Sequence, residues 1–188
     1  LFLADTTVNI KPTAEEIADI TLMVAKEVRN FNIEPRIAML SYSNFGSSDT
    51  EEAKMMAEAT KIVKQRNPSL IVDGEMQGML AFNKDILKEN YPFSELVDVD
   101  VNVLIFPNLT AGNVAYHLLK EIGGVDIIGP ILLGLKKPVN VLQLGSGVRN
   151  IINMATVAVV DAQLKSRVDT NTEVQRSSWW KRLKKRKK

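Results

Sequence analysis

The chain has 188 residues and a mass of 20.9 kDa, with 45% apolar and 24% charged residues. This balance is typical of one globular domain, or of two small lobes, and excludes a disordered chain. The lack of cysteine excludes disulfides and thiolate metal sites and fits a cytoplasmic protein. A single histidine, His117, leaves no second imidazole for a zinc site, so no metal site is expected. No apolar run reaches the length of a membrane-spanning helix.

The net charge of +2 conceals an asymmetry along the chain. All 22 acidic residues lie at or before Glu173, whereas 176–188 holds eight of the 24 basic residues. The preceding part, with sixteen basic and 22 acidic residues, has a net charge of −6, which excludes a globally basic nucleic-acid-binding domain. Residues 169–188 are predicted to form a disordered basic tail. Contact of Trp179 and Trp180 with an anionic membrane or nucleic acid is the alternative, although neither partner is expected.

Short apolar segments alternate with segments of helical periodicity along most of the chain. In chain order, strands are predicted at 1–4, 36–41, 70–72, 102–106 and 126–128. Helices are predicted from Pro12 to Arg29, from caps at Ser47–Asp49 to about Gln65, and over 79–89, 110–122 and about 147–165. Strands separated by helices indicate an α/β protein with a mostly parallel sheet between two helical layers.

Ligands gather at the carboxyl ends of the strands in such a sheet. In this chain those ends are polar or contain glycine, and they are Asp5–Thr7, Ser41–Ser48, Asp73–Gln77, Pro107–Asn113 and Gly129–Leu135. The sequence therefore locates a binding edge before it identifies a ligand.

The segment Ser41–Asp49 leaves a strand and opens a helix, so free N–H groups at Gly46–Asp49 are predicted to receive a phosphate. It lacks the Gly-Lys-Ser/Thr of a Walker motif, and a capped loop without ligand is equally consistent. Asp73 and Glu75 are a second candidate pair. Their carboxylates either orient a metal or a base, or belong to a turn whose aspartate caps the next helix.

The remaining polar loops each allow two interpretations. Thr110 and Asn113 are candidate ligand contacts, but Thr110 as a helix N-cap explains the pattern as well. His117 lies within a helix and has no visible carboxylate partner, which favours a structural role over a catalytic one. Lys136 and Lys137 either meet a polyphosphate or stay solvated, and Gly145–Gly147 lacks the spacing of the dinucleotide fingerprint.

Five sequence strings occur in the order seen in one family: ADTTVNIKPTAEEIADI, EPRIAMLSYSNFGSSD, VDGEMQ, VNVLIFPNLTAGN and IGPILLGLKKPVNVL. Over residues 1 to about 165 the chain resembles the phosphate acetyltransferase (phosphotransacetylase) family. The resemblance implies the isocitrate/isopropylmalate dehydrogenase-like, three-layer α/β/α fold, a homodimer, and CoA or acetyl-CoA bound between two lobes. It implies that 1–135 is the second lobe and that 136–168 is a crossover loop and returning helix of a first lobe. That lobe is expected upstream of Leu1, which is not expected to be the natural start.

The chain departs from the family at the catalytic turn. After Lys-Pro-Val-Asn the enzymes usually read Asp-Leu-Ser-Arg-Gly-Cys-Ser-x-x-Asp, with the serine, the arginine and the last aspartate assigned to acyl transfer. The alignment puts Gln143, Leu144 and Asn150 at these positions, and Glu121 where a further arginine is expected. Leucine cannot bind an anion and asparagine cannot act as a carboxylate base. The resemblance therefore implies a degenerate site without catalytic residues.

Asn153-Met154 and the degenerate turn are similar to a subset of the family, the C-terminal phosphotransacetylase-like domain of bacterial NADP-dependent malic enzymes. The resemblance implies a domain without activity of its own, in a parent that decarboxylates malate oxidatively to pyruvate, with NADP and a divalent metal bound upstream. Acetyl-CoA or CoA is the expected effector, and a homodimer through this domain and a higher homo-oligomer are the expected assemblies. The expected ligand contacts are Ser43, Gly46, Ser47, Ser48, Asn108, Asn113, Lys137, Asn140, Gly145 and Ser146.

Three alternatives remain open from the sequence. The first is an active phosphate acetyltransferase that uses other residues, such as Ser43 or Ser146, and the second is a phosphate butyryltransferase-like relative. Both would convert acyl-CoA and phosphate to acyl phosphate and CoA. The third is a purely structural oligomerisation module.

Overall fold

The computed structural model describes the backbone of residues 1–142 and 145–185 and the side chains of 1–142 and 145–166. The chain divides into two compact units, Leu1–Asp126 and Ile127–Lys188. Each unit is described here by itself. The division falls nearer the N-terminus than the lobe boundary predicted after residue 135.

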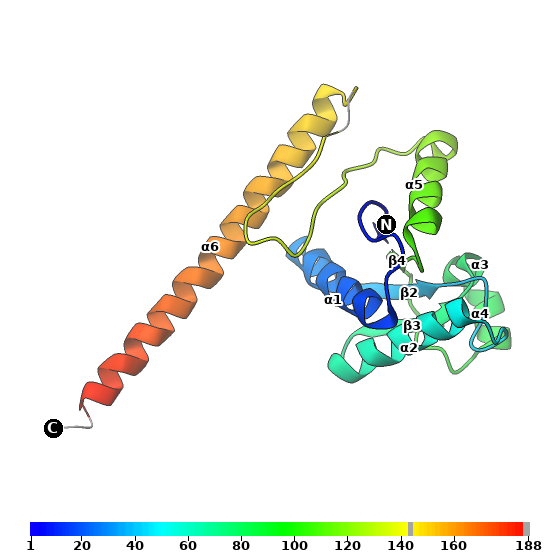
Figure 1. Cartoon of the computed structure of the whole chain (residues 1–188), viewed down its shortest axis with the longest axis horizontal. Coiled ribbons are helices and arrows are strands. Elements are labelled where there is room, and N and C mark those ends of the chain that lie inside the picture. The colour runs from blue at the N-terminus through cyan, green and yellow to red at the C-terminus, as the bar shows by residue number, and fades with distance from the viewer. Residues whose placement is uncertain (143–144, 186–188) are drawn as a thin grey trace. The chain divides into compact units, whose positions relative to one another are not determined.

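The first unit is built on a four-stranded sheet in the order β1-β4-β2-β3 (Figure 1). The strands are β1 (Phe2–Ala4), β2 (Arg36–Leu40), β3 (Ile71–Met76) and β4 (Val103–Ile105), and all neighbouring pairs are parallel. The helices are α1 (Ala14–Asn30), α2 (Glu51–Arg66), α3 (Gly78–Phe82), α4 (Lys84–Asn90) and α5 (Leu109–Gly123). The predicted α/β class with a parallel sheet is confirmed.

Alternation of side chains along the strands gives the sheet two apolar faces. Met39 lies on the α1 side, where the buried Thr21 hydroxyl contacts its sulfur at 3.6 Å. On the opposite face Ala38, Leu40 and Leu104 form one buried cluster with side chains of α3, α4 and the segment after α4. Ala111 and Ala115 of α5 pack against the edge of this cluster. The sheet is therefore covered on both sides, and its carboxyl edge lies between the helical layers.

Helix boundaries follow from caps, and some differ from prediction. Thr13 and Glu16 form a capping box at the start of α1. The N-cap of α2 is Thr50 and not one of Ser47–Asp49. The helix predicted over 79–89 is two helices, because Asn83 ends α3 and its side chain caps α4 by accepting from the Ile86 N–H.

Two predictions for strands were wrong. β3 continues to Met76, so Asp73 and Glu75 lie inside a strand and not in a turn. Residues 126–128 form no strand, and the chain beyond α5 has only an isolated antiparallel bridge between Ile131 and Asn140 among the described residues.

The second unit consists of an extended loop and one long helix, α6 (Val148–Lys185). Two hydrogen bonds hold the loop on the helix: Asn140 Nδ2 donates to Met154 O at 3.2 Å, and Lys165 Nζ donates to Leu135 O at 3.1 Å. The backbone of α6 stays helical past the predicted end near Lys165, through most of the segment predicted to be disordered. No helix among the described residues has both the length and the apolar character needed to cross a membrane.

Candidate functional site

The carboxyl end of β1 is organised by the side chain of Asp5. Its carboxylate accepts hydrogen bonds from the backbone N–H groups of Thr7, Val8 and Asn9 at 2.7, 3.0 and 2.7 Å, and from the Asn9 amide at 2.6 Å. Partial burial alone would raise the pKa of Asp5, but these donors outweigh it and hold the pKa below the usual value. Asp5 is therefore a charged hub that fixes the 5–9 loop at the binding edge.

We expect Asp5→Asn to lower the free energy of unfolding by about 2 kcal/mol near neutral pH, because an amide cannot accept all these donors. The pKa of Asp5 is lower when folded, so its charge contributes fully above the unfolded value, near 3.8, and this contribution is lost as pH falls through the folded value. Urea unfolding at a series of pH values should therefore show a constant gap between the two proteins above about pH 5 that narrows below pH 4. A gap that widens in acid would contradict this assignment.

The start of α5 packs directly against the β1 loop. Asn108, and not Thr110, is the N-cap, since its side chain accepts from the Ala111 N–H at 2.9 Å. Asn113 Nδ2 donates to Thr6 O at 3.2 Å, so both predicted contacts on this loop have protein partners. Gly112 is buried so close to the strand end that an added Cβ would lie 2.1 Å from the Asp5 carbonyl oxygen. The β1 and β4 loops thus form one tightly packed structure.

The loop between β2 and α2 closes around a buried carboxylate that the sequence analysis placed in a turn. Glu75 is 2% exposed, and its Oε1 accepts from Ser43 Oγ at 2.8 Å and from the Gly46 N–H at 2.7 Å. Its backbone carbonyl accepts from the Phe45 N–H at 2.8 Å. Strand β3 therefore holds the 43–48 loop through both the side chain and the backbone of one residue.

The predicted phosphate cradle on this loop is filled by the protein itself. Gly46 N–H donates to Glu75, Ser47 N–H donates to Asn44 O at 3.0 Å, and Ser48 N–H donates to Ser43 Oγ at 3.1 Å. The expectation of free N–H groups at these three residues was wrong, because an internal carboxylate takes the place of an external anion. Strand alternation could not have shown the direction of Glu75, because the register shifts there: Met39 pairs with Gly74 and Leu40 with Met76.

Asp73 forms an ion pair with α2 and does not cap a helix. Lys64 Nζ lies 2.8 Å from Asp73 Oδ1 and 2.9 Å from Glu95 Oε1, and the Glu95 N–H donates to Asp73 Oδ2 at 3.0 Å. Desolvation opposes the charge of Lys64, but the two carboxylates raise its pKa above the ordinary value. Within the described part of the chain no group of acidic or histidine side chains could hold a metal, so the prediction that this pair orients a metal finds no support.

An open surface cavity of about 400 Å³ lies beside this ion pair. Its lining comes from α2 and β3, and consists of Ala57, Thr60, Lys61, Lys64, Gln65, Asp73 and Gly74. None of the predicted ligand contacts belongs to it. The salt-bridged lysine at its centre is already neutralised by two carboxylates, so the cavity offers no unpaired charge from that group.

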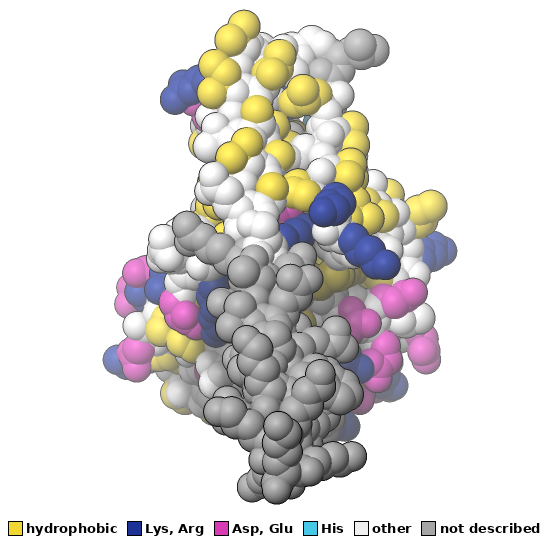
Figure 2. Space-filling view, turned by 90° about the vertical axis from the view of Figure 1, so that its left-hand side faces the viewer, with side chains coloured by type: hydrophobic (Ala, Val, Ile, Leu, Met, Phe, Trp, Pro, Cys, Tyr) yellow, Lys and Arg dark blue, Asp and Glu magenta, His cyan; other side chains and the backbone are white. Residues whose placement is uncertain are grey.

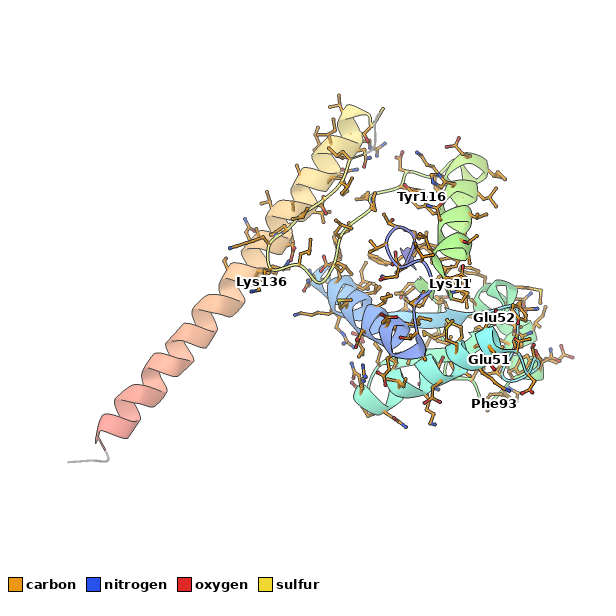
Figure 3. All side chains as sticks on the ribbon, viewed as in Figure 1. Lys11, Glu51, Glu52, Phe93, Tyr116 and Lys136 are labelled. Carbon is orange, nitrogen blue, oxygen red and sulfur yellow. The ribbon has the colours of Figure 1, made fainter. Side chains whose placement is uncertain are left out.

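Two exposed polar side chains, His117 and Lys11, lie outside these loops. His117 is exposed on α5, and its ring centroid lies 4.9 Å from that of the neighbouring Tyr116. Figure 3 shows Lys11 beside the start of α5, where the Ile10 carbonyl accepts from the Leu109 N–H. An exposed histidine in this setting matches a role outside catalysis.

The predicted ligand contacts of the second unit lie along the loop before α6, from the part held by Lys165 and Met154 to the residues just before Val148. Lys137 is exposed, as is Gly145, which has a φ of +86°, and Asn140 is held by Met154. Ser146 is half-buried in the segment that leads into the helix. Gln143 and Leu144, the positions aligned with the family's serine and arginine, lie outside the described residues.

Asn150 lies in the first turn of α6. Its Oδ1 is buried and has no hydrogen-bond partner among the described atoms. A carboxylate in this first helical turn would be favoured by the helix dipole and by the orphan N–H groups there. The amide present here neither carries that charge nor accepts a proton as a base.

Comparison with known proteins agrees with the fold and the loop sequences. A family model described as phosphate acetyl/butaryl transferase matches residues 1–159, and the chain belongs to this family. Its parallel α/β fold is shared by a phosphotransacetylase from Streptococcus pyogenes, with a TM-score of 0.79 and 40% identity over 85% of this chain and 48% of that one. The predicted family and fold are therefore confirmed.

Two groups of curated relatives are similar to the chain. It is 50% identical over 163 residues to the NADP-dependent malic enzyme of Haemophilus influenzae, a match of 87% of this chain and 21% of that protein. It is 39% identical over 159 residues to the phosphate acetyltransferase of Bacillus subtilis, a match of 85% and 49%. The chain thus spans about a fifth of the malic enzyme and about half of the acetyltransferase.

Proposed function

We propose that the chain is the regulatory and oligomerisation domain of a malic enzyme, which binds acetyl-CoA without converting it. The observation that carries the proposal is the replacement of the family's serine, arginine and aspartate by Gln143, Leu144 and Asn150. Loss of a single electrostatic donor to a transition state costs about 100- to 1,000-fold in rate, and here the cation and the base are replaced together. NADP and a divalent metal would be bound by the other part of the parent protein.

The 50% identity over 163 residues to a malic enzyme supports this parent. A domain that holds acetyl-CoA and lacks the chemistry can act only through its affinity for the ligand. Such binding shifts an equilibrium between two states of the assembly by the difference in affinity for those states. The effector is therefore expected to alter the activity of the parent enzyme.

The residues proposed to contact acetyl-CoA are the predicted set, with one change. Asn108 and Asn113 in the first unit, and separately Lys137, Asn140, Gly145 and Ser146 in the second, keep their proposed roles as ligand contacts. The residues of the 43–48 loop (Ser43, Gly46, Ser47 and Ser48) are proposed as a wall of the site and not as an anion cradle, because their donors already serve Glu75 and one another.

We expect Lys137→Ala to weaken acetyl-CoA binding about 5- to 150-fold, the range for a lost charged hydrogen bond. Isothermal titration calorimetry on the intact protein measures the dissociation constant. Lys136→Ala is the matched control, since the neighbouring lysine is equally exposed and should leave the affinity unchanged. An unaltered dissociation constant for Lys137→Ala would remove this residue from the site.

A second candidate is an active phosphate acetyltransferase or butyryltransferase, favoured by the match to that family and by 39% identity to a phosphate acetyltransferase. Mixing the intact protein with CoA and either acetyl phosphate or butyryl phosphate separates the two candidates. We expect no thioester at enzymatic rates but a measurable heat of acetyl-CoA binding. Rapid thioester formation would establish the second candidate, and the absence of both signals would leave a structural module.

Exposed apolar side chains support the proposed oligomerisation. On α5 they include Val114, Leu118 and Ile122, which is 80% exposed. The described part of α6 adds Val148 and Ile152, and Figure 2 shows hydrophobic side chains gathered over that helix and the loop before it. Patches of this kind mark surfaces that another chain or segment covers. Sedimentation velocity of the intact protein should accordingly show at least a dimer.

A further inference from the structure

A group of aromatic and methionine side chains, four exposed and two partly buried, lies on the 42–45 loop, on α3 and after α4. It consists of Tyr42, Phe45, Met79, Phe82, Tyr91 and Phe93, and is called the aromatic surface here. The Phe45 ring centroid lies 4.9 Å from that of Tyr91 and 5.1 Å from that of Phe93. Phe93 is nevertheless 68% exposed and Phe82 58% exposed. The Phe93 ring therefore contacts Phe45 and Tyr91 and still presents much of its own area to solvent.

Hydrogen bonds join two of the three segments that supply the aromatic surface. Gln77 Nε2 donates to Tyr42 O at 2.9 Å, and the Gln77 N–H donates to Asn44 Oδ1 at 2.8 Å. These bonds fix the β2–α2 loop to the start of α3, which carries Met79 and Phe82. The 42–45 loop and the start of α3 are therefore adjacent on this surface.

Phe45 occupies this surface at a conformational cost. Its φ is +47°, in the left-handed region that bulky side chains rarely adopt and that costs about 1–3 kcal/mol. The hydrogen bond from its N–H to the Glu75 carbonyl and the ring contacts with Tyr91 and Phe93 maintain the conformation. The Phe45 ring is partly buried against the core cluster, so this packing also maintains the conformation.

Acidic side chains border the aromatic surface. The Tyr42 hydroxyl is hydrogen-bonded to Thr50 Oγ1, which caps α2 just before the exposed Glu51 and Glu52. Glu89, also exposed, lies at the end of α4 two residues before Tyr91. Figure 3 labels Glu51, Glu52 and Phe93 in this part of the molecule. Aromatic faces and carboxylates both attract a cation, so the surface fits a basic segment that carries apolar anchors.

The chain itself contains a segment of this chemistry. Residues 176–188 hold eight basic residues and the adjacent Trp179 and Trp180, and no acidic residue. Tryptophan and arginine are the residues that most often dominate binding at such surfaces. We propose that the 176–188 segment of one copy docks, through its two tryptophans, on the aromatic surface of a second copy.

The geometry of α6 favours a second copy. The helix is fixed to its own loop as far as Lys165, whose ammonium is bonded to Leu135 O and Asp161. From Lys165 to Trp180 a helix rises about 22 Å, so the helix backbone at Trp180 lies well beyond that anchor. Such a contact closes into a dimer when two copies exchange their segments, and otherwise forms larger rings or open chains.

Tryptophan fluorescence of the full chain tests the proposal directly, because Trp179 and Trp180 are the only tryptophans in the sequence. We expect a blue-shifted emission at high protein concentration and low salt. Dilution over about a hundredfold range should shift the emission to that of solvated indole. Raising the salt to about 1 M should do the same, because the Debye length then falls to about 3 Å and the charges are screened.

Variants locate the contact. Phe93→Ala should weaken the concentration-dependent association about tenfold or more, because it removes an exposed anchor ring and leaves the core intact. Glu51→Gln combined with Glu52→Gln should weaken it about fivefold at low salt and reduce its salt dependence. Ile33→Ala, an apolar side chain 39% exposed after α1, and Glu121→Gln on α5 are the controls, and neither should change it.

Three results would overturn the proposal. Emission of solvated indole at every concentration would show that the tryptophans are not docked. A blue shift that does not depend on concentration would place the contact within one copy. A shift that appears only on addition of vesicles containing phosphatidylglycerol would assign the segment to an anionic membrane surface.

Discussion

Gly112→Ala is expected to destabilise the first unit by about 3 kcal/mol or more. The new Cβ would lie 2.1 Å from the Asp5 carbonyl oxygen and 3.1 Å from its carbon, both backbone atoms that no rotamer change can move. Either α5 or the end of β1 must shift, and the bond between Asn113 Nδ2 and Thr6 O would be lost with it. Urea unfolding followed by far-UV circular dichroism measures the loss, and hydrogen exchange at the β1 and β4 amides locates it.

Gly123→Ala is the matched control on the same helix. An added Cβ there meets only the Val125 side chain, at 3.8 Å, and alanine is the better helix former. This variant should be neutral or slightly stabilising, by up to about 1 kcal/mol. Equal behaviour of the two variants would show that the close approach of α5 to β1 does not limit stability.

Glu75→Ala should lower the free energy of unfolding by about 3 kcal/mol, because it leaves the buried Ser43 hydroxyl and the Gly46 N–H without their acceptor. Part of the loss is offset, since a buried charge is also removed. The measurement is urea unfolding, with hydrogen exchange at Gly46 and Ser48 to report on the loop.

Glu95→Ala serves as the control for Glu75→Ala. This glutamate is exposed and shares Lys64 with Asp73, so its loss should cost well under about 1 kcal/mol. Faster exchange confined to the 43–48 loop in Glu75→Ala is the expected pattern. Unchanged exchange at Gly46 would contradict the role of Glu75 as the hub of the loop.

The strands and helices of the first unit were predictable because their periodicity is strong and each is closed by a recognisable turn or cap. β2 and β4 are continuous apolar runs, as expected for strands buried on both faces. The caps were less predictable where several candidates adjoin. Ser47, Ser48, Asp49 and Thr50 all have capping side chains, and only tertiary contacts decide that Ser47 serves the loop and Thr50 the helix.

The failures have specific causes. Asp73 and Glu75 were taken for a turn because glycine separates two carboxylates, but Gly74 has a φ of +143° and packs against Met39 inside β3. A partner 32 residues away, Ser43, satisfies Glu75, and local patterns do not reveal such pairings. The pattern at 126–128 predicted a strand, but a strand needs a neighbour to pair with, and the described residues provide none there.

The hydrogen bonds of the Glu75 carboxylate also have a consequence for the proposed regulation by a ligand. Because internal hydrogen bonds already hold the 43–48 loop in the absence of a ligand, its conformation is preorganised and ligand binding should not cause it to fold. If the domain is regulatory as proposed, a change on ligand binding would have to begin in another segment. The first turn of α6, where Asn150 Oδ1 is buried without a donor among the described atoms, is the segment to test.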